Sequence, residues 1–136
     1  MRHDPLPHDP LPLEEVWRRL SERGTPSPEL RSVAEAALER NARLATILDL
    51  RGLSDVTDFF VIATGDSDTH ARAISENILD RTREDGFRPV GVEGLNAGRW
   101  VLMDYVGLIV HVFLGEVREF YQLERLWGDA PLFELE

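Results

Sequence analysis

The residues best suited to chemistry form the stretch Gly65-Asp66-Ser67-Asp68, which directly follows an apolar segment. Glycine permits a tight turn, and the two carboxylates offer the hard oxygen ligands that magnesium prefers. A nucleotide-transfer site needs several carboxylates that converge on paired metal ions, and the sequence adds only Asp104, on a later segment. The alternative is that Asp68 caps a helix, with acidic residues near its positive end. The sequence favours this structural interpretation.

A serine held against a histidine is the other chemistry to consider. Ser67 and Ser75 flank His70, but no strand-turn-helix nucleophile elbow is visible. His111 lies in an apolar segment, where a packed, hydrogen-bonded histidine is more common than a base. Lysine is absent, which excludes a glycine-rich phosphate loop with a lysine. We therefore expect no catalytic residue, no metal and no cofactor.

Composition narrows the class of partner. The 136 residues suit one domain with some additional chain, and they contain no cysteine, which excludes disulfides and thiolate nucleophiles. The formal net charge is −10, and all 15 basic residues are arginine. Proteins bind nucleic acid largely by neutralising phosphates with basic side chains. The sequence thus predicts little direct contact with nucleic acid and favours a basic protein surface as the partner.

The chain shows no pattern typical of export or membrane insertion. Its first 12 residues lack the apolar run of a signal peptide, and no stretch approaches the roughly 20 apolar residues of a membrane span. We expect a soluble, cytoplasmic protein that does not contact a membrane.

The N-terminal region differs from the remainder. Residues 3–7 and 8–12 repeat the letters HDPLP, whose prolines favour an extended arm. Residues 13–23 then carry an apolar helical stripe that ends at Gly24. This helix either packs on the body or docks a partner. We predict two units: an arm with a short accessory helix at 1–24, and an α/β domain at 25–136.

Apolar spacing in the body predicts alternating helices and strands. Together they indicate an α/β fold with a single mixed β-sheet of about five strands and flanking helices. We expect helices from Pro28 to about Arg43, from Asp68 to Gly86 and from Gly115 towards Pro131, with strands at 44–50, 58–64, 89–92, 99–105 and 108–114.

The last two strands should form a hairpin that turns at Val106-Gly107 and has two different faces. One face is aliphatic and should lie under helices. The other mixes aromatic and polar side chains, which makes it the candidate working face. The expected pairs are Val101 with Val112 and Met103 with Val110 on the first face, and Trp100 with Phe113, Leu102 with His111 and Asp104 with Ile109 on the second.

Five motifs in this order resemble the ribosomal silencing factor family, also called RsfS or Iojap. They are DFFVIATGDSD at 58–68, EG at 93–94, WVLMDY at 100–105, HVF at 111–113 and REFYQLERLWGDAP at 118–131. The resemblance covers about residues 28–131 and leaves residues 1–24 outside. The chain departs from the family at its hairpin turn, where members often carry glycine followed by an acid.

The resemblance implies a fold similar to that of nucleotidyltransferases, but no catalysis. It also implies binding to the large ribosomal subunit through its fourteenth ribosomal protein, which blocks association with the small subunit and represses translation. The partner-binding residues that we predict come from the hairpin and the last helix: Trp100, Asp104, Tyr105, His111, Phe113, Arg118, Tyr121 and Glu124.

Two other functions stay open at this point. One is a magnesium-dependent, nucleotidyltransferase-like enzyme that uses Asp66, Asp68 and Asp104. The other is a homodimer in which the mixed hairpin face binds a second copy. The same surface would then serve both the copy and the ribosome.

Overall fold

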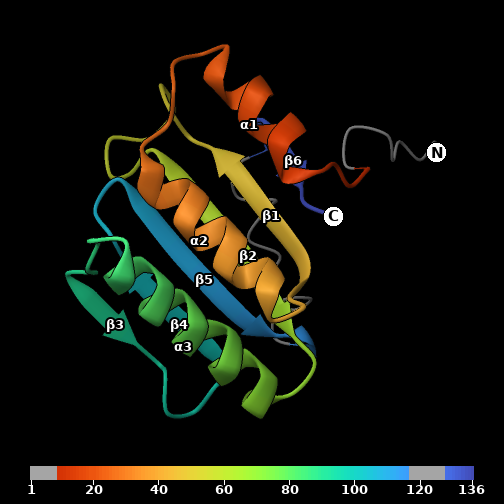
Figure 1. Cartoon of the computed structure of the whole chain (residues 1–136), viewed down its shortest axis with the longest axis vertical. Helices are drawn as coiled ribbons and strands as arrows, with labels where there is room; N and C mark the ends of the chain where they lie inside the picture. Colours follow the sequence, from red (N-terminus) through yellow and green to blue (C-terminus); the bar gives the residue numbers. More distant parts are fainter. Residues whose placement is uncertain (1–8, 117–127) are drawn as a thin grey trace.

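The fold is a single six-stranded mixed sheet with helices packed against it (Figure 1). The computed structural model of the chain describes residues 9–116 and 128–136. The helices are α1 (Leu13–Ser21), α2 (Pro28–Glu39) and α3 (Asp68–Glu84), and the strands are β1 (Arg43–Asp49), β2 (Phe59–Gly65), β3 (Gly91–Glu93), β4 (Trp100–Asp104), β5 (Leu108–Leu114) and β6 (Leu132–Glu134). No helix within these two ranges is long and apolar enough to span a membrane.

The strand order in the sheet is β3-β4-β5-β2-β1-β6. Strands β2 and β5 are parallel, and every other neighbouring pair is antiparallel. The α/β class, the single mixed sheet and the flanking helices are therefore confirmed. Strand β6 is the sixth and was not expected, because three residues after a proline carry too little periodicity to predict a strand.

The predicted hairpin register is confirmed pair by pair. Trp100 lies opposite Phe113 and Asp104 opposite Ile109, with the three intervening pairs as expected. A bulge between the strands would have moved every later side chain to the other face. Since no shift occurs, both hairpin faces have the composition that the sequence predicted.

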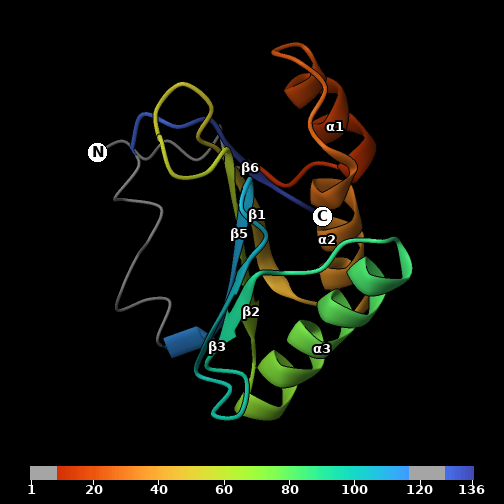
Figure 2. The same ribbon diagram turned by 90° about the vertical axis from the view of Figure 1, so that its left-hand side faces the viewer.

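The larger hydrophobic core lies between the sheet and the helices. Figure 2 shows α1, α2 and α3 together on one side of the sheet. The aliphatic hairpin face belongs to this core, as predicted, and its burial supplies much of the driving force for folding. The hairpin contributes Val101, Met103, Val110 and Val112, and the helices contribute Val16, Leu20, Leu30, Val33, Ile74 and Ile78, among others.

Helix α1 packs on the body, as one of the two expectations for it stated, and its docking of a partner stays a prediction. Val16 and Leu20 are buried in the main core, and the Arg31 guanidinium carbon lies 5.5 Å from the centroid of the Trp17 ring. Leu11, just before the helix, forms a parallel bridge to Leu135 beside β6. The division of the chain at residue 24 stays a prediction.

A buried carboxylate links α1 to the sheet. Asp49 is almost fully buried and accepts hydrogen bonds from Arg51 at 2.8 and 2.9 Å and from Arg23 at 3.1 Å. Burial disfavours its charge, but the bonds from Arg51 outweigh that cost and lower the pKa of Asp49. Arg51 also donates to the carbonyl oxygens of Leu20 and Gly24, at the end of α1. Asp49 and Arg51 thus connect the end of β1 with the end of α1.

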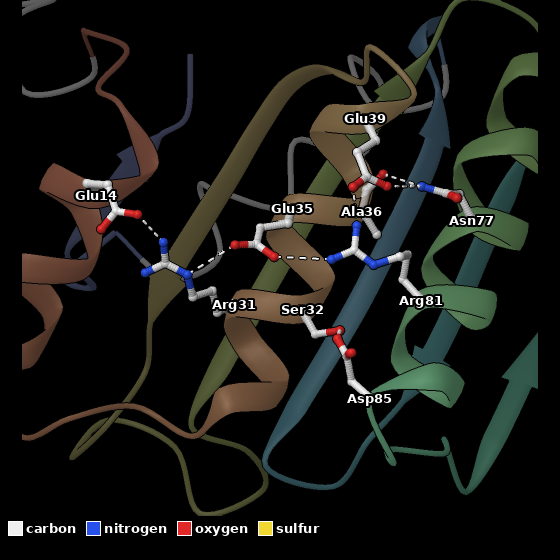
Figure 3. A network of polar contacts seen from close by, with 9 residues as sticks. All are labelled: Glu14, Arg31, Ser32, Glu35, Ala36, Glu39, Asn77, Arg81 and Asp85. Atoms are coloured by element: carbon white, nitrogen blue, oxygen red, sulfur yellow. Dashed lines mark hydrogen bonds and ion pairs between the residues drawn. The ribbon is translucent and has the colours of Figure 1, made fainter.

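The outer surface of the helix layer carries a chain of ion pairs (Figure 3). Glu35 on α2 accepts from Arg31 and from Arg81 of α3, each at 3.1 Å. Arg81 also pairs with Glu39, which accepts from Asn77 at 3.0 Å. These contacts lower the pKa of Glu39, chiefly through Asn77 and then Arg81. Exposed pairs each contribute little, so packing remains the main stabilisation.

One expected helix boundary differs from the structure, and one expected helix lies largely outside the described residues. Helix α2 ends at Glu39 and not near Arg43, because Asn41 takes a positive φ of 58° that no helix accommodates. The helix expected between Gly115 and Pro131 lies largely at 117–127, outside the described residues, so that expectation stays a prediction.

Candidate partner-binding face

Four rings cluster on the sheet face that α1, α2 and α3 leave uncovered. We call Phe60, Trp100, His111 and Phe113 the aromatic face. The centroid of His111 lies 4.9 Å from that of Phe60 and 6.0 Å from that of Phe113, and Trp100 lies 4.9 Å from Phe113. Parallel pairing of β2 with β5 brings Phe60 to this cluster, next to Ile109. Rings at such separations attract one another beyond the area that they bury.

His111 is the polar centre of this face. Its Nδ1 accepts a hydrogen bond of 3.1 Å from Nε1–H of Trp100, so the neutral ring carries its proton on Nε2. Burial lowers the pKa of His111 to about 4, which keeps the ring neutral near pH 7. The buried Nε2 has no hydrogen-bond partner within residues 9–116 and 128–136. The face therefore holds a buried donor that no residue in the described ranges satisfies.

Part of the aromatic face is covered by the chain itself. Phe113 is fully buried in a second, smaller core with Leu48, Leu50 and Ile62. Trp100, Ala130 and Leu132 pack against this cluster and stay partly exposed. Phe113 is thus covered by the chain, whereas Phe60 and Trp100 are the partly exposed rings of the face.

The two predicted residues at the end of β4 have opposite environments. The Asp104 carboxylate is half-exposed, and its Oδ1 accepts from the Val106 backbone N–H at 2.8 Å. Tyr105 instead points into the main core, where its hydroxyl lies 2.7 Å from that of Thr82 on α3. Burial raises the pKa of Tyr105. Asp104 is available to a partner, whereas Tyr105 is held beneath the helices.

The acidic turn after β2 is occupied by structural contacts. A side chain at Gly65 would meet the backbone of Ala71 at 2.6 Å, so glycine permits close packing of α3 on β2. Ser67 is the N-cap of α3, and its side chain accepts from the His70 N–H at 3.0 Å. The expectation that Asp68 caps this helix is wrong, because Asp68 is already its first helical residue.

Both ring nitrogens of His70 bind backbone groups. Nδ1 accepts from the Asp66 N–H at 2.9 Å, and Nε2 lies 2.8 Å from the carbonyl oxygen of Arg40. The ring thus joins the end of α2 to the start of α3. Ser75 donates to the Ala71 carbonyl and not to the histidine. These contacts leave no serine–histidine pair of the kind that a hydrolase needs.

The three carboxylates of the alternative enzyme do not converge. Asp66 and Asp68 follow β2, whose last residue, Gly65, pairs with Leu114. Asp104 ends β4 at the opposite end of the sheet, beside Ile109. Asp66 bonds to Arg43 at 2.6 Å, and no cluster of three candidate metal ligands occurs in the described part of the chain. These residues cannot hold paired metal ions.

Comparison with known proteins decides the family. A family model described as "Ribosomal silencing factor during starvation" matches residues 24–136. Ribosomal silencing factor RsfS of Bacillus subtilis is 41% identical over 107 residues, which cover 79% of this chain and 91% of that protein. The chain belongs to the ribosomal silencing factor family. The resemblance carried by the five motifs is thereby confirmed.

Further relatives extend this family beyond bacteria and into solved structures. Protein Iojap, chloroplastic, of Zea mays is 36% identical over 104 residues, covering 76% of this chain and 45% of that protein. A crystal structure from Chromobacterium violaceum, 33% identical, superposes with a TM-score of 0.72 and covers 74% of this chain and 83% of that one. Members of the family thus share the sheet and helices described above.

The predicted partner-binding residues separate into three groups within this family fold. Trp100 and Asp104 are accessible, while His111, Phe113 and Tyr105 are buried. Arg118, Tyr121 and Glu124 lie outside the described residues. All eight remain a prediction of partner-binding residues.

Sequence reasoning missed the exposed aliphatic residues at the hairpin end of the sheet. Val106 and Val90 are among the most exposed large apolar side chains in the described part. The departure from the family pattern at the turn was the available signal for Val106. No sequence signal brings Val90 to this end of the sheet. The pairing of β3 with β4, in which Gly91 lies opposite Asp104, does so.

Proposed function

We propose that this protein is a ribosomal silencing factor. It binds the large ribosomal subunit through the fourteenth ribosomal protein of that subunit and prevents the small subunit from joining. Relatives that cover most of this chain carry the name ribosomal silencing factor. A relative from Mus musculus is named mitochondrial assembly of ribosomal large subunit protein 1. The proposed site of action is the cytoplasm, where the subunits meet.

The aromatic face is the observation that supports this proposal best. It carries the partly exposed Trp100 and Asp104 on one sheet, above a buried His111 whose Nε2 has no partner among the described residues. Aromatic anchors surrounded by polar groups dominate protein–protein hot spots. The charge of −10 matches a basic ribosomal protein, and opposite charges speed association and suppress wrong partners.

The proposed mechanism is steric and needs no catalysis. Once docked, the folded domain occupies space that the small subunit requires. Repression then follows from occupancy of the large subunit, so it depends on affinity and on protein concentration. Trp100 acts as the apolar anchor, and Asp104 pairs with arginine or lysine of the ribosomal protein.

The proposal is tested by co-sedimentation of the full chain with purified large subunits, with and without small subunits. The unchanged chain should pellet with large subunits and reduce the yield of joined ribosomes. Trp100→Ala should weaken binding by about 30-fold or more, since a buried aromatic anchor contributes roughly 2 kcal/mol or more. A correctly folded Trp100→Ala protein that binds as the unchanged chain does would refute the assignment of this face.

The chain offers a matched control on its opposite side. Trp17 is also half-buried, but it packs under Arg31 on the helix layer. Trp17→Ala should therefore lower stability without changing subunit binding. Equal losses of binding in both variants would show that folding, and not the aromatic face, is responsible.

A homodimer is proposed as a second use of the same face. The exposed edge of Trp100 beside buried rings is as suited to a second copy as to a ribosomal protein. Light scattering of the free chain, repeated with the ribosomal protein added, tests this idea. A dimer that dissociates as the ribosomal protein binds supports it, and a monomer at all concentrations refutes it.

A further inference from the structure

Three valines are exposed near the end of the sheet where the β4–β5 hairpin turns. Val106 is 61% exposed, Val90 71% and Val56 77%. Val106 lies in the hairpin turn, Val90 just before β3, and Val56 in the loop that leads from β1 to β2. Figure 1 shows the start of β5 and this loop at the same end of the sheet.

Backbone hydrogen bonds tie these three segments together. The Asp58 N–H donates to the Gly107 carbonyl oxygen at 3.1 Å, which joins the loop to the turn. The Val90 N–H donates to the Asp104 carbonyl oxygen at 2.7 Å, which joins the start of β3 to the same turn. These bonds fix the backbones of the three segments relative to one another at this end of the sheet.

The hairpin turn holds its valine in a strained conformation. Val106 has a φ of 75°, and the Gly107 N–H donates to the Tyr105 carbonyl oxygen at 3.0 Å. A three-residue turn with such a φ is rare, and a β-branched residue fits it poorly. Asp104 stabilises the turn through its bond to the Val106 N–H. Glycine would fit without strain, so the backbone strain at Val106 lowers stability, and its exposed side chain gains little burial in return.

The charges around the valines are mainly negative. The three segments contain Asp55, Asp58 and Asp104, against two basic residues, Arg88 and Arg51, of which Arg51 is already paired with Asp49. Asp55 and Asp58 are exposed, and Asp104 is half-exposed. Exposed aliphatic groups bordered by carboxylates complement an apolar pocket bordered by arginine or lysine. A second copy of this chain is disfavoured, because the same carboxylates would then face one another.

We propose that this surface, the hairpin-tip patch of Val56, Val90 and Val106 with Asp55, Asp58 and Asp104, is a second anchor for a basic protein partner. Val106 enters an apolar pocket of the partner, and the carboxylates pair with cations at its rim. This inference rests on the proposed function. It extends the docking surface along the hairpin, from the aromatic face at one end of β4 to the turn at the other.

The test exploits the opposite effects of one substitution on folding and on binding. Val106→Gly removes the strain and the apolar side chain together, so its melting temperature should equal or exceed that of the unchanged chain. Its affinity for purified large subunits, measured by pelleting over a range of concentrations, should fall about tenfold or more, as expected for the loss of a buried valine. Val90→Ser should weaken binding in the same direction.

Leu44 supplies the matched control. It is also an exposed aliphatic residue with a positive φ, 52°, but it lies at the other end of the sheet, near the pairing of Arg43 with Thr64. Leu44→Gly should change subunit affinity by less than about twofold, a difference well below that of an anchor. Any general effect of glycine on the sheet would appear equally in this variant.

The outcomes separate the patch from the proposed function. If the unchanged chain pellets with large subunits and Val106→Gly pellets equally well, the hairpin-tip patch is refuted and the ribosomal function stands. Equal losses in Val106→Gly and Leu44→Gly also refute the patch. If the unchanged chain does not pellet at all, the proposed function fails and the patch fails with it.

Discussion

Two buried ionisable side chains, one on each face of the sheet, have opposite hydrogen-bond environments. On the helix-covered face, the Asp49 carboxylate is fully engaged by Arg51 and Arg23. On the aromatic face, His111 keeps a buried Nε2 without a partner in the described residues. A buried group left unsatisfied lowers stability, whereas a satisfied one is close to neutral. The buried carboxylate of the first face is therefore satisfied within the fold, and the aromatic face is the one proposed to bind a partner.

The two faces also differ in the kind of side chain that they expose or bury. The helix-covered face carries aliphatic side chains and a network of ion pairs at its surface. The aromatic face and the hairpin-tip patch carry rings, a donor without a partner in residues 9–116 and 128–136, and a strained valine. Local features that reduce stability mark the regions proposed to bind a partner.

The largest expected effect compares neighbouring residues of β4 that point to opposite faces. Met103 is fully buried under the helices, and Leu102 is half-exposed on the other face. Met103→Ala should lower the free energy of unfolding by about 3 kcal/mol, because it leaves a cavity in the main core. Leu102→Ala should cost less than about half of that. Urea denaturation measures both, and equal losses would contradict the contrast between the faces.

Acid should destabilise the aromatic face through His111. Burial lowers the pKa of this ring from 6.5 to about 4, so the unfolded chain binds more protons between those two values. Its contribution to stability is complete above pH 6.5 and is lost as the pH falls towards 4, by up to about 3 kcal/mol. Urea denaturation across this pH range measures the slope. His111→Gln should flatten it, and an unchanged slope would refute the origin in His111.

A smaller loss of stability is expected when the buried carboxylate on the helix-covered face is replaced. Asp49→Asn should lower the free energy of unfolding by about 2 kcal/mol, because the arginines around it lose their shared carboxylate. Asp55→Asn, at an exposed site, provides the control and should change stability by less than about 0.5 kcal/mol. If the two variants unfold at the same urea concentration, the hydrogen bonds of Asp49 with Arg51 and Arg23 contribute less to stability than expected.

The smallest effect concerns the surface of the helix layer. Glu39→Gln removes one partner of Arg81 and should cost only about 0.5 kcal/mol at low salt, as is usual for exposed pairs. The loss should disappear in about 1 M salt, where charges separated by more than about 3 Å are screened. Thermal unfolding at two salt concentrations measures this, and a loss that survives high salt would indicate packing.

The β4–β5 hairpin is the region whose structure was predicted best from the alternation of apolar and polar residues. Alternation in residues 99–114 predicted both the pairing and the side that faces the helices, since a strand's side chains alternate strictly. The same alternation could not show that Leu132 packs against the smaller core that contains Phe113, because that packing joins segments far apart in the chain. Tyr105 was predicted to meet a partner, but its side chain follows the alternation into the core beneath α3.

The acidic turn at Gly65–Asp68 is a region where the sequence alone predicted the structure poorly. Its composition allowed a metal site, and only the strand order shows that Asp104 lies at the far end of the sheet from Asp66. The cap of α3 was misplaced by one residue, because serine and aspartate are both good caps and local sequence does not choose between them. The family resemblance needed neither detail, since it rested on motif order along the chain.

The sequence by itself determined the α/β class, the hairpin register, the excess of negative charge and the family. These depend on local alternation, composition and motif spacing, which the chain carries without folding. The tertiary structure decided which rings are reachable, that β6 completes the sheet, and that Val56 and Val90 flank a strained Val106. Such features arise from contacts between distant segments, and their energies depend on burial that no local pattern records.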